Sequence, residues 1–294
     1  MSLLDLHPDV PDPNRPREEK LEIFEAGTGH GALTLNLSRA IHVANTAAPP
    51  IPAKECPIEE AEVWEVQKEA YNTWRNNRNA IIHTLDISGE YQAHAQKVVK
   101  NFRSGMYFPH VDFHVSTIND YLTSRLKETN GAPFLDHAIL DLPSTHSYLE
   151  IISKALKPDG TLITFCPSIT QINQCVLLAK EEGMPLFLER VLEVGAGVGV
   201  GGREWDVRPV KPRAVLKAQE AAKAAEEEAT SAMDNTTESL PAKDEGWELV
   251  CRPKVGIRVA GGGFLGLWKK IVLFKKDEEA EAVVATHSDA DVIV

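Results

Sequence analysis

The sequence Ile23-Phe-Glu-Ala-Gly-Thr-Gly-His-Gly-Ala32 carries the strongest structural signal of this chain. An apolar run reaches an acidic residue, Glu25, and three glycines follow at alternate positions. The apolar–polar pattern of Leu33-Thr-Leu-Asn-Leu37 then indicates the start of a helix. Because glycine adopts positive φ and lets a ligand approach the backbone closely, the stretch predicts a strand, a tight turn and a helix N-terminus.

The spacing of these glycines separates two classes of ligand. It reads G-x-G-x-G, whereas folds that bind nicotinamide dinucleotides carry G-x-G-x-x-G. Together with the acidic residue just before the turn, this spacing favours S-adenosylmethionine (SAM) as the ligand. The alternative is a purely structural strand–helix turn, and the rest of the chain has to decide between the two.

Charge and composition set limits on the partner and the compartment. The net charge is −12, but residues 214–246 hold eight acidic residues against three lysines, and residues 277–294 hold six acidic residues and no Lys or Arg. The remaining body is close to neutral, so the total charge says little about a nucleic-acid partner. No apolar run reaches about 18 residues, which predicts no membrane span, and the N-terminus lacks the pattern of a targeting signal. The four cysteines form no C-x-x-C pair, so we expect reduced thiols and no metal site.

Short apolar runs alternate with amphipathic stretches, which predicts an α/β fold with a doubly wound, seven-stranded sheet and an antiparallel edge hairpin. Lys157-Pro-Asp-Gly160 is typical of a turn before the fifth strand. The predicted strands are Ile23–Ala26, Ile81–Ile87, Val111–Val115, Ala138–Leu142, Thr161–Cys166, Leu186–Val194 and Leu265–Phe274. The predicted helices are Ala32–Ile41, Glu90–Phe102, Ile118–Lys127, Ser147–Ala155 and Ile169–Glu182.

These elements define one domain over residues 21–274, preceded by a short extension, 1–20, and followed by an acidic tail, 275–294, that we expect to be disordered. Two insertions interrupt the domain. Residues 43–80 begin rich in proline and become helix-prone, and residues 214–246 are of low complexity. Long insertions are tolerated because closing a longer loop adds little entropic cost.

Polar residues at strand ends are the candidate site residues, because ligands of such sheets lie at the carboxyl ends of the strands. Asp86 ends the second strand, where a carboxylate accepts both ribose hydroxyls of SAM; the alternative is a solvated acid. Ser116 ends the third strand, where it either contacts the adenine or caps a helix.

Asp141 ends the fourth strand in Ala138-Ile-Leu-Asp-Leu-Pro143. A carboxylate there reaches both a methyl donor and an incoming base. It accepts a hydrogen bond from an exocyclic amine and so raises the nucleophilicity of the adjacent ring nitrogen. The alternative is a helix cap.

Five ordered motifs together resemble the catalytic subunit of tRNA (adenine-58-N1)-methyltransferases, a class I SAM-dependent family with a Rossmann-like sheet. They are Glu25-Ala-Gly-Thr-Gly-His-Gly31; Leu140-Asp-Leu-Pro143; Phe165-Cys-Pro-Ser168 with Gln171; Arg203-Glu-Trp-Asp-Val-Arg208; and Cys251-Arg-Pro253 with the later Phe264-Leu-Gly-Leu267. The similarity runs from about residue 21 to 274, outside both insertions.

The resemblance implies methyl transfer from SAM to N1 of an adenosine in the tRNA T-loop, at position 58, without a metal. Asp141 would be the catalytic carboxylate. The residues implied to surround SAM are Glu25, Gly27, Thr28, Gly29, His30, Gly31, Ala32, Asp86, Ser116 and Asp141. The implied partners are tRNA and either a related non-catalytic subunit or further copies of the chain, and the expected compartment is the nucleus, with the mitochondrion as the alternative.

The sequence departs from the family pattern at several points. The family's N-terminal β-rich domain is not seen ahead of the glycine turn, and Ser2-Leu-Leu-Asp-Leu6 is interpreted as the remnant of a helix that leads into it. Ser116 replaces an acid, and Ser144-Thr-His146 replaces a Pro-Trp pair, where His146 would have to stack on the base instead. Ala260-Gly-Gly-Gly263 replaces a His-Thr-Gly turn. These departures leave open a non-catalytic, methyltransferase-like scaffold subunit, or an enzyme acting on mitochondrial ribosomal RNA or a small molecule.

Arg203, Arg208, Lys211 and Arg213 gather in one stretch around Trp205. They form either a basic edge for tRNA phosphates or a structural Arg/Trp contact, in the hairpin of the sixth and seventh strands or at a subunit interface, and the structural interpretation is favoured.

Overall fold

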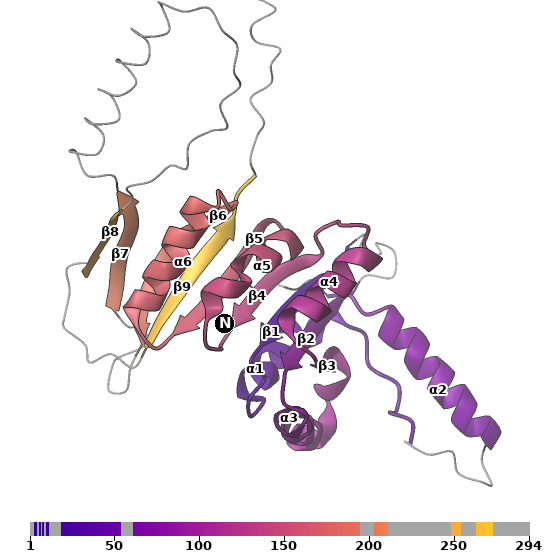
Figure 1. The fold of residues 1–294 in the computed structure, drawn as a ribbon. Coiled ribbons are helices and arrows are strands. Elements are labelled where there is room, and N and C mark those ends of the chain that lie inside the picture. The colour runs from indigo at the N-terminus through magenta and orange to yellow at the C-terminus, as the bar shows by residue number, and fades with distance from the viewer. Residues whose placement is uncertain are drawn as a thin grey trace, which may run out of the picture.

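The computed structural model describes residues 3, 4, 6, 8, 10, 11, 19–53, 61–194, 203–210, 248–253 and 263–272. Its strands are β1 (Leu21–Ala26), β2 (Ala80–Asp86), β3 (Val111–Val115), β4 (Leu135–Leu140), β5 (Leu156–Cys166), β6 (Leu186–Val194), β7 (Arg203–Val210), β8 (Glu248–Pro253) and β9 (Gly263–Lys270). They form one nine-stranded sheet in the order β3-β2-β1-β4-β5-β9-β6-β7-β8 (Figure 1).

The sheet has a parallel half and an antiparallel half. Strands β3, β2, β1, β4 and β5 are parallel to their neighbours. From β5 onward every pairing is antiparallel, through β9, β6, β7 and β8. The direction of winding reverses at β1, which lies between β2 and β4, and in doubly wound sheets ligands bind at this switch point.

Helices cover both faces of the sheet (Figure 1). Those that cover it are α1 (Ala32–Ile41), α3 (Gly89–Asn101), α4 (Ile118–Glu128), α5 (Leu149–Ala155) and α6 (Ile169–Glu181), whereas α2 (Ala61–Asn76) extends away from it. One buried cluster joins Phe24 of β1 to apolar residues of α4, α5 and α6, and a second joins Ile23 to apolar residues of α1 and α3. The alternation of Ile23 and Phe24 along β1 thus supplies both cores.

The predicted α/β, doubly wound architecture is confirmed, and so is an antiparallel edge. The strand count of seven is wrong, because Arg203–Val210 and Glu248–Pro253 extend the ladder beyond β6. The predicted turn at Lys157–Gly160 is also wrong. These residues lie within β5, where the pairing with β4 shifts register and Asp159 adopts a φ of 64°. A bulge therefore takes the place of the turn.

The insertion at residues 43–80 forms α2 and the extended segment beside it. The indole N–H of Trp64 donates to the carbonyl of Ala53 (2.9 Å), and that of Trp74 donates to the hydroxyl of Thr46 (3.0 Å). None of the α2 side chains is buried, and the helix extends away from the sheet (Figure 1).

The structure bears on the remaining domain predictions only in part. Leu4 of the N-terminal extension is buried in the cluster beneath α1 and α3, with Leu3 and Leu6 packed against it. The predictions for residues 214–246 and 275–294 lie outside the described residues. Among the helices that the model describes, none is both long and apolar enough to cross a membrane.

Candidate ligand site at the glycine turn

The turn after β1 requires glycine because the main chain there passes close to its neighbours. Gly27, Gly29 and Gly31 have φ angles of 93°, 51° and 76°. A Cβ atom on Gly27 would lie 2.1 Å from the carbonyl oxygen of Asp141, and one on Gly31 would lie 3.1 Å from the Cβ of Ala95. Without side chains at these two positions, β1 meets the end of β4 at Gly27, and α1 meets α3 at Gly31.

Asp86 fastens the glycine turn to the end of β2. Its Oδ2 accepts a hydrogen bond from the N–H of Gly29 (3.2 Å), and its Oδ1 accepts one from the N–H of Ser88 (2.9 Å). The carboxylate is half-buried, and each oxygen retains a second lone pair for a ligand hydroxyl. The geometry is consistent with a ribose contact and adds a structural role that the sequence did not indicate.

Glu25 lies beneath the turn and is only 1% exposed. Its Oε2 accepts a hydrogen bond from the hydroxyl of Thr34 (2.6 Å), while Oε1 has no hydrogen-bond partner among the described residues. Burial raises the pKa of this carboxyl to about 7, against the hydrogen bonds from Thr34 and Thr84. Contact between Glu25 and a ligand stays a prediction; what the model shows is a carboxyl packed under α1.

Thr28 is buried with Glu25, and its hydroxyl lies 2.7 Å from that of Thr84 in β2. Thr84 and Thr34, which join β1, β2 and α1 below the turn, were not among the predicted site residues. The available signal in the sequence was Thr84, a polar residue in the buried part of β2. Ile87, which follows Asp86 and is 76% exposed, was also not among the predicted site residues.

Asp141 is the first residue after β4 and is exposed. Its N–H donates to the carbonyl of Ala26 (3.0 Å), which holds it beside the glycine turn. Its carboxylate has no hydrogen-bond or ion-pair partner among the described residues, and partial burial raises its pKa. A carboxylate that is fixed by its backbone yet free at its oxygens is available to a substrate.

The other predicted residues lie around the same sheet edge. The N–H of Ser116 donates to the carbonyl of Asp86 (3.2 Å), and the alternative that Ser116 caps a helix is wrong, because Thr117 caps α4. Ala32 is the first residue of α1. The ring of His30 lies 5.5 Å from that of His94 and 6.5 Å from that of Tyr91, both on α3.

Three of the motifs have structural explanations. Ser168 and Gln171 form a capping box at the start of α6, with the N–H of Ser168 donating to Oε1 of Gln171 (3.1 Å). Trp205 donates from its indole N–H to Glu193 (3.0 Å) and meets the ring of Phe264 edge-on, in line with the structural interpretation of that stretch. Lys211 and Arg213 lie outside the described residues.

His146 lies in a 3-10 helix, Thr145–Tyr148, and lines a cavity of about 400 Å³ together with Leu178 and Glu182 of α6 and its C-terminal cap. The model thus places it against the second half of α6, and stacking of its ring on a base stays a prediction.

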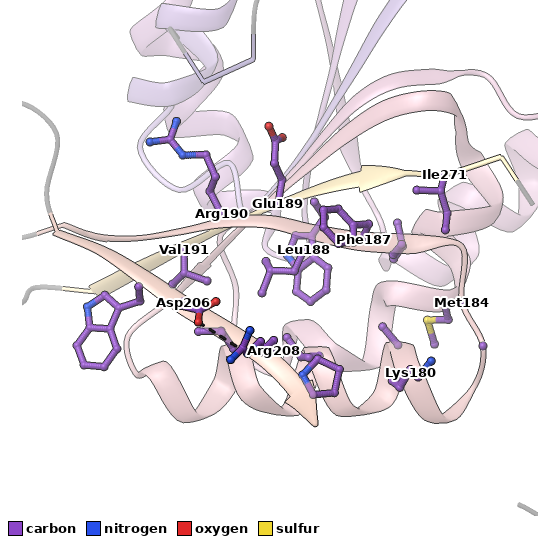
Figure 2. A pocket seen from close by; sticks show the side chains of 18 residues that line it. Lys180, Met184, Phe187, Leu188, Glu189, Arg190, Val191, Asp206, Arg208 and Ile271 are labelled. Atoms are coloured by element: carbon purple, nitrogen blue, oxygen red, sulfur yellow. Dashed lines mark ion pairs between the residues drawn. The ribbon is translucent and has the colours of Figure 1, made fainter. Parts of the chain in front are cut away.

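A larger groove of about 710 Å³ lies away from the glycine turn, between α6 and strands β6 and β7 (Figure 2). Its walls are mainly apolar, and Arg208 and Asp206 face each other across 3.8 Å at its rim. Phe187 and Ile271, which line it, are 58% and 44% exposed. Among the described residues, no group of three or more His, Cys, Asp or Glu side chains is placed to hold a metal ion.

The sequence and the structure of the chain were compared with those of known proteins. No family model matches the chain. The solved structures similar to it include a SAM-dependent O-methyltransferase from Thermotoga maritima (TM-score 0.45, 15% identity, covering 94% of this chain and 64% of that one). They also include the tRNA (m1A58) methyltransferase TrmI from Aquifex aeolicus (TM-score 0.41, 15% identity, covering 86% and 63%).

Two curated proteins match in sequence, the tRNA (adenine(58)-N(1))-methyltransferases TrmI from two strains of Thermus thermophilus. Each is 28% identical over 208 residues, which is 71% of this chain and 56% of the relative. The chain therefore spans about half the length of the curated relatives it matches. Over that length, it is similar in sequence to tRNA (adenine(58)-N(1))-methyltransferases, as its motifs indicated.

Proposed function

We propose that this chain is a SAM-dependent methyltransferase that acts on N1 of an adenosine in tRNA, at position 58 of the T-loop. The observation that carries the proposal is the contact between Gly27 and Asp141, which fixes an unpartnered carboxylate beside the glycine turn. The sequence similarity to the Thermus enzymes supports the choice of reaction and of substrate.

The residues present fit SAM. Gly29 leaves open space where a Cβ atom would stand, Asp86 retains acceptor capacity for a ribose, and the exposed Ile87 offers an apolar contact for an adenine. When bound, SAM supplies a methyl group on a sulfonium, which is a strong electrophile and needs no further activation.

Asp141 would orient the target base. Its carboxylate accepts a hydrogen bond from the exocyclic amine of the adenine, which turns the lone pair of N1 towards the methyl donor and stabilises the positive charge that develops on the ring. Because the pKa of Asp141 is raised, protonation removes this acceptor at a higher pH than for an ordinary aspartate, so activity should fall as the pH becomes acid. The base has to leave its stack in the T-loop to reach this edge of the sheet.

We further propose a protein partner, either a related non-catalytic subunit or another copy of the chain, and a nuclear location, with the mitochondrion as the alternative. The exposed Phe187 and Ile271, which line the large groove, support a protein contact, because apolar side chains gathered at a surface favour association. A non-catalytic scaffold subunit is the second candidate function, and Ser116 at the end of β3 in place of an acid favours it.

The test has two steps. Calorimetry measures SAM binding to the full chain, with and without a co-purified partner. Mass spectrometry then locates methylation on an unmodified tRNA transcript for the wild type, for Asp141→Ala and for the control Asp159→Asn, which changes an exposed acid in the β5 bulge.

We expect Asp141→Ala to bind SAM within a few-fold of the wild type and to lose at least about 100-fold in methylation rate, the range of a positioned acid–base group. Asp159→Asn should retain both. Absence of SAM binding in every preparation would refute the catalytic proposal in favour of the scaffold, and full activity of Asp141→Ala would refute the role of that carboxylate. Methylation of a mitochondrial ribosomal transcript and not of tRNA would show that the substrate is ribosomal RNA.

A further inference from the structure

Helix α3 presents a row of aromatic and cationic side chains to solvent. Tyr91, His94, Lys97 and Lys100 stand at every third position along it, and Arg103 continues the spacing just after its end; all five are exposed. Residues three apart on a helix are neighbours on its surface, so these side chains form a row that winds obliquely across the exposed side of α3, which we call the α3 ridge. From Tyr91 to Lys100 it is about 14 Å long at the rise of an α-helix.

The ridge lies on the outer face of the molecule. The buried residues of α3 are Gln92, Ala95 and Val99, and Lys97 lies on the opposite side of the helix. Helix α1 lies alongside, since Gly31 packs on Ala95. There Arg39 is exposed opposite the buried Leu37 and Ile41, which adds a further cation to the same face.

These cations are not neutralised by neighbouring acids. Among the described residues, Arg39, Lys97, Lys100 and Arg103 form no ion pair within 4.0 Å, and Glu90, in the first turn, is the single acidic residue in α3 while α1 has none. The opposite face of the sheet differs. There Arg125 pairs with Glu128 on α4, and Lys154 pairs with Glu150 on α5.

The ridge begins at the candidate ligand site. The ring of His30, in the glycine turn, lies 5.5 Å from the ring of His94 and 6.5 Å from that of Tyr91. An extended ligand that reaches the turn from this side would meet aromatic rings first and cations further along α3.

We propose that the α3 ridge, with Arg39, binds the phosphate backbone of the RNA substrate. Lys and Arg side chains neutralise phosphates and release counterions, and exposed aromatic rings stack on bases without regard to sequence. Although the chain has a net charge of −12, a face on which four cations form no ion pair with the described residues suits a polyanion. The inference rests on the proposed function for the identity of the polyanion.

The experiment compares two double variants of the full chain. Lys97→Ala/Lys100→Ala removes two charges from the ridge, and Lys127→Ala/Lys154→Ala removes two exposed lysines from α4 and α5 on the opposite face. Fluorescence anisotropy measures the binding of a labelled, unmodified tRNA transcript at several salt concentrations, and calorimetry measures SAM binding to the same preparations. A synthetic peptide of residues 277–294 is the second probe, because that acidic segment of the chain is the competing polyanion.

We expect the ridge variant to bind the transcript roughly 10- to 100-fold more weakly at low salt, and its plot of log affinity against log salt to flatten by about one to two units, the effect of two lost phosphate contacts. The control variant should bind as the wild type does, and both should bind SAM equally. Equal loss in the two variants, no RNA binding by the wild type, or binding of the peptide in place of RNA would each overturn the inference. None of these results bears on SAM binding, whose absence would instead count against the proposed function.

Discussion

Gly27 is the residue whose replacement tests the site most directly. Alanine there would place a Cβ atom 2.1 Å from the carbonyl oxygen of Asp141, at a φ of 93° that side chains rarely adopt. Because the carbonyl belongs to the backbone, β1 and β4 would have to separate at their ends. We expect Gly27→Ala to lower the free energy of unfolding by about 3 kcal/mol or more and to abolish SAM binding, measured by urea unfolding and calorimetry.

Gly131→Ala is the matched control for Gly27. Gly131 has a similar φ, 81°, but nothing lies within 4 Å of the Cβ it lacks. The free energy of unfolding of the control should therefore fall only by the cost of a side chain at positive φ, about 1 kcal/mol, and its SAM affinity should not change. Equal stability of the two variants would show that the close approach of Gly27 to Asp141 does not determine which residues position 27 tolerates.

Glu25 makes stability depend on pH. Its pKa is raised from 4.5 to about 7 in the folded chain, so folding binds a proton, and the stabilisation is complete below about pH 4.5 and lost as pH rises through about 7. Glu25→Gln imitates the protonated form. We expect its free energy of unfolding to rise relative to that of the wild type by about 3 kcal/mol as the pH increases from 4.5 to 8.5. Urea unfolding of both proteins across that range measures it, and a difference that stays constant with pH would contradict a protonated Glu25.

At the scale of elements, one carboxylate joins the end of the α2 insertion to β3. Asp112 accepts hydrogen bonds from Arg78 (2.8 Å) and from Arg75 (2.7 Å). Burial alone would raise its pKa, but the hydrogen bonds and charges of Arg78, followed by those of Arg75, lower it to about 2. The side chain of Arg78 is 3% exposed and that of Arg75 is 46% exposed, so the two arginines pair with the same acid in different surroundings.

This difference predicts unequal variants. Arg78→Ala leaves Oδ2 of the largely buried Asp112 and the carbonyl of Pro109 without the donors that Arg78 supplies, while Arg75 still donates to Oδ1. We expect the variant to lower the free energy of unfolding by about 3 kcal/mol. Arg75→Ala removes a solvent-screened pair and should lower it by less than about 1 kcal/mol. Thermal and urea unfolding measure both values, and similar losses would show that burial does not govern this pair.

The regular elements were the predictable part of the structure. Helix α1 has the predicted bounds, because its buried residues recur at helical spacing between a glycine and the end of the apolar stripe. Strands β7 and β8 were missed, since Arg203–Val210 alternates charged and apolar residues around Pro209 and lacks a clear apolar run. The β5 bulge was missed because Lys157-Pro-Asp-Gly160 has the composition of a turn, and only the pairing of Leu156 with Leu135 shows that the strand has already begun.

At the scale of the whole molecule, parallel strands explain why the candidate site was predictable. Asp86, Ser116 and Asp141 were inferred from strand ends, and β1 to β4 bring their carboxyl ends to one edge of the sheet. The burial of Glu25 was not predictable, because it depends on how Thr34 and Thr84 pack below the turn. The cationic face of α1 and α3 was hidden in sequence by the acidic segments that dominate the net charge.

Strand β9, the last of the strands in the described residues, lies between β5 and β6 and pairs with both, which joins the parallel strands to β6, β7 and β8. In the order of synthesis, β6, β7 and β8 therefore leave the ribosome before the strand that joins them to the rest. Until residues 263–270 have been synthesised, β5 and β6 each have one edge whose backbone N–H and C=O groups lack the partner strand β9. The described sheet becomes continuous when β9 inserts between β5 and β6. A nascent chain that ends before β9 therefore exposes unpaired strand edges, through which it associates with other chains.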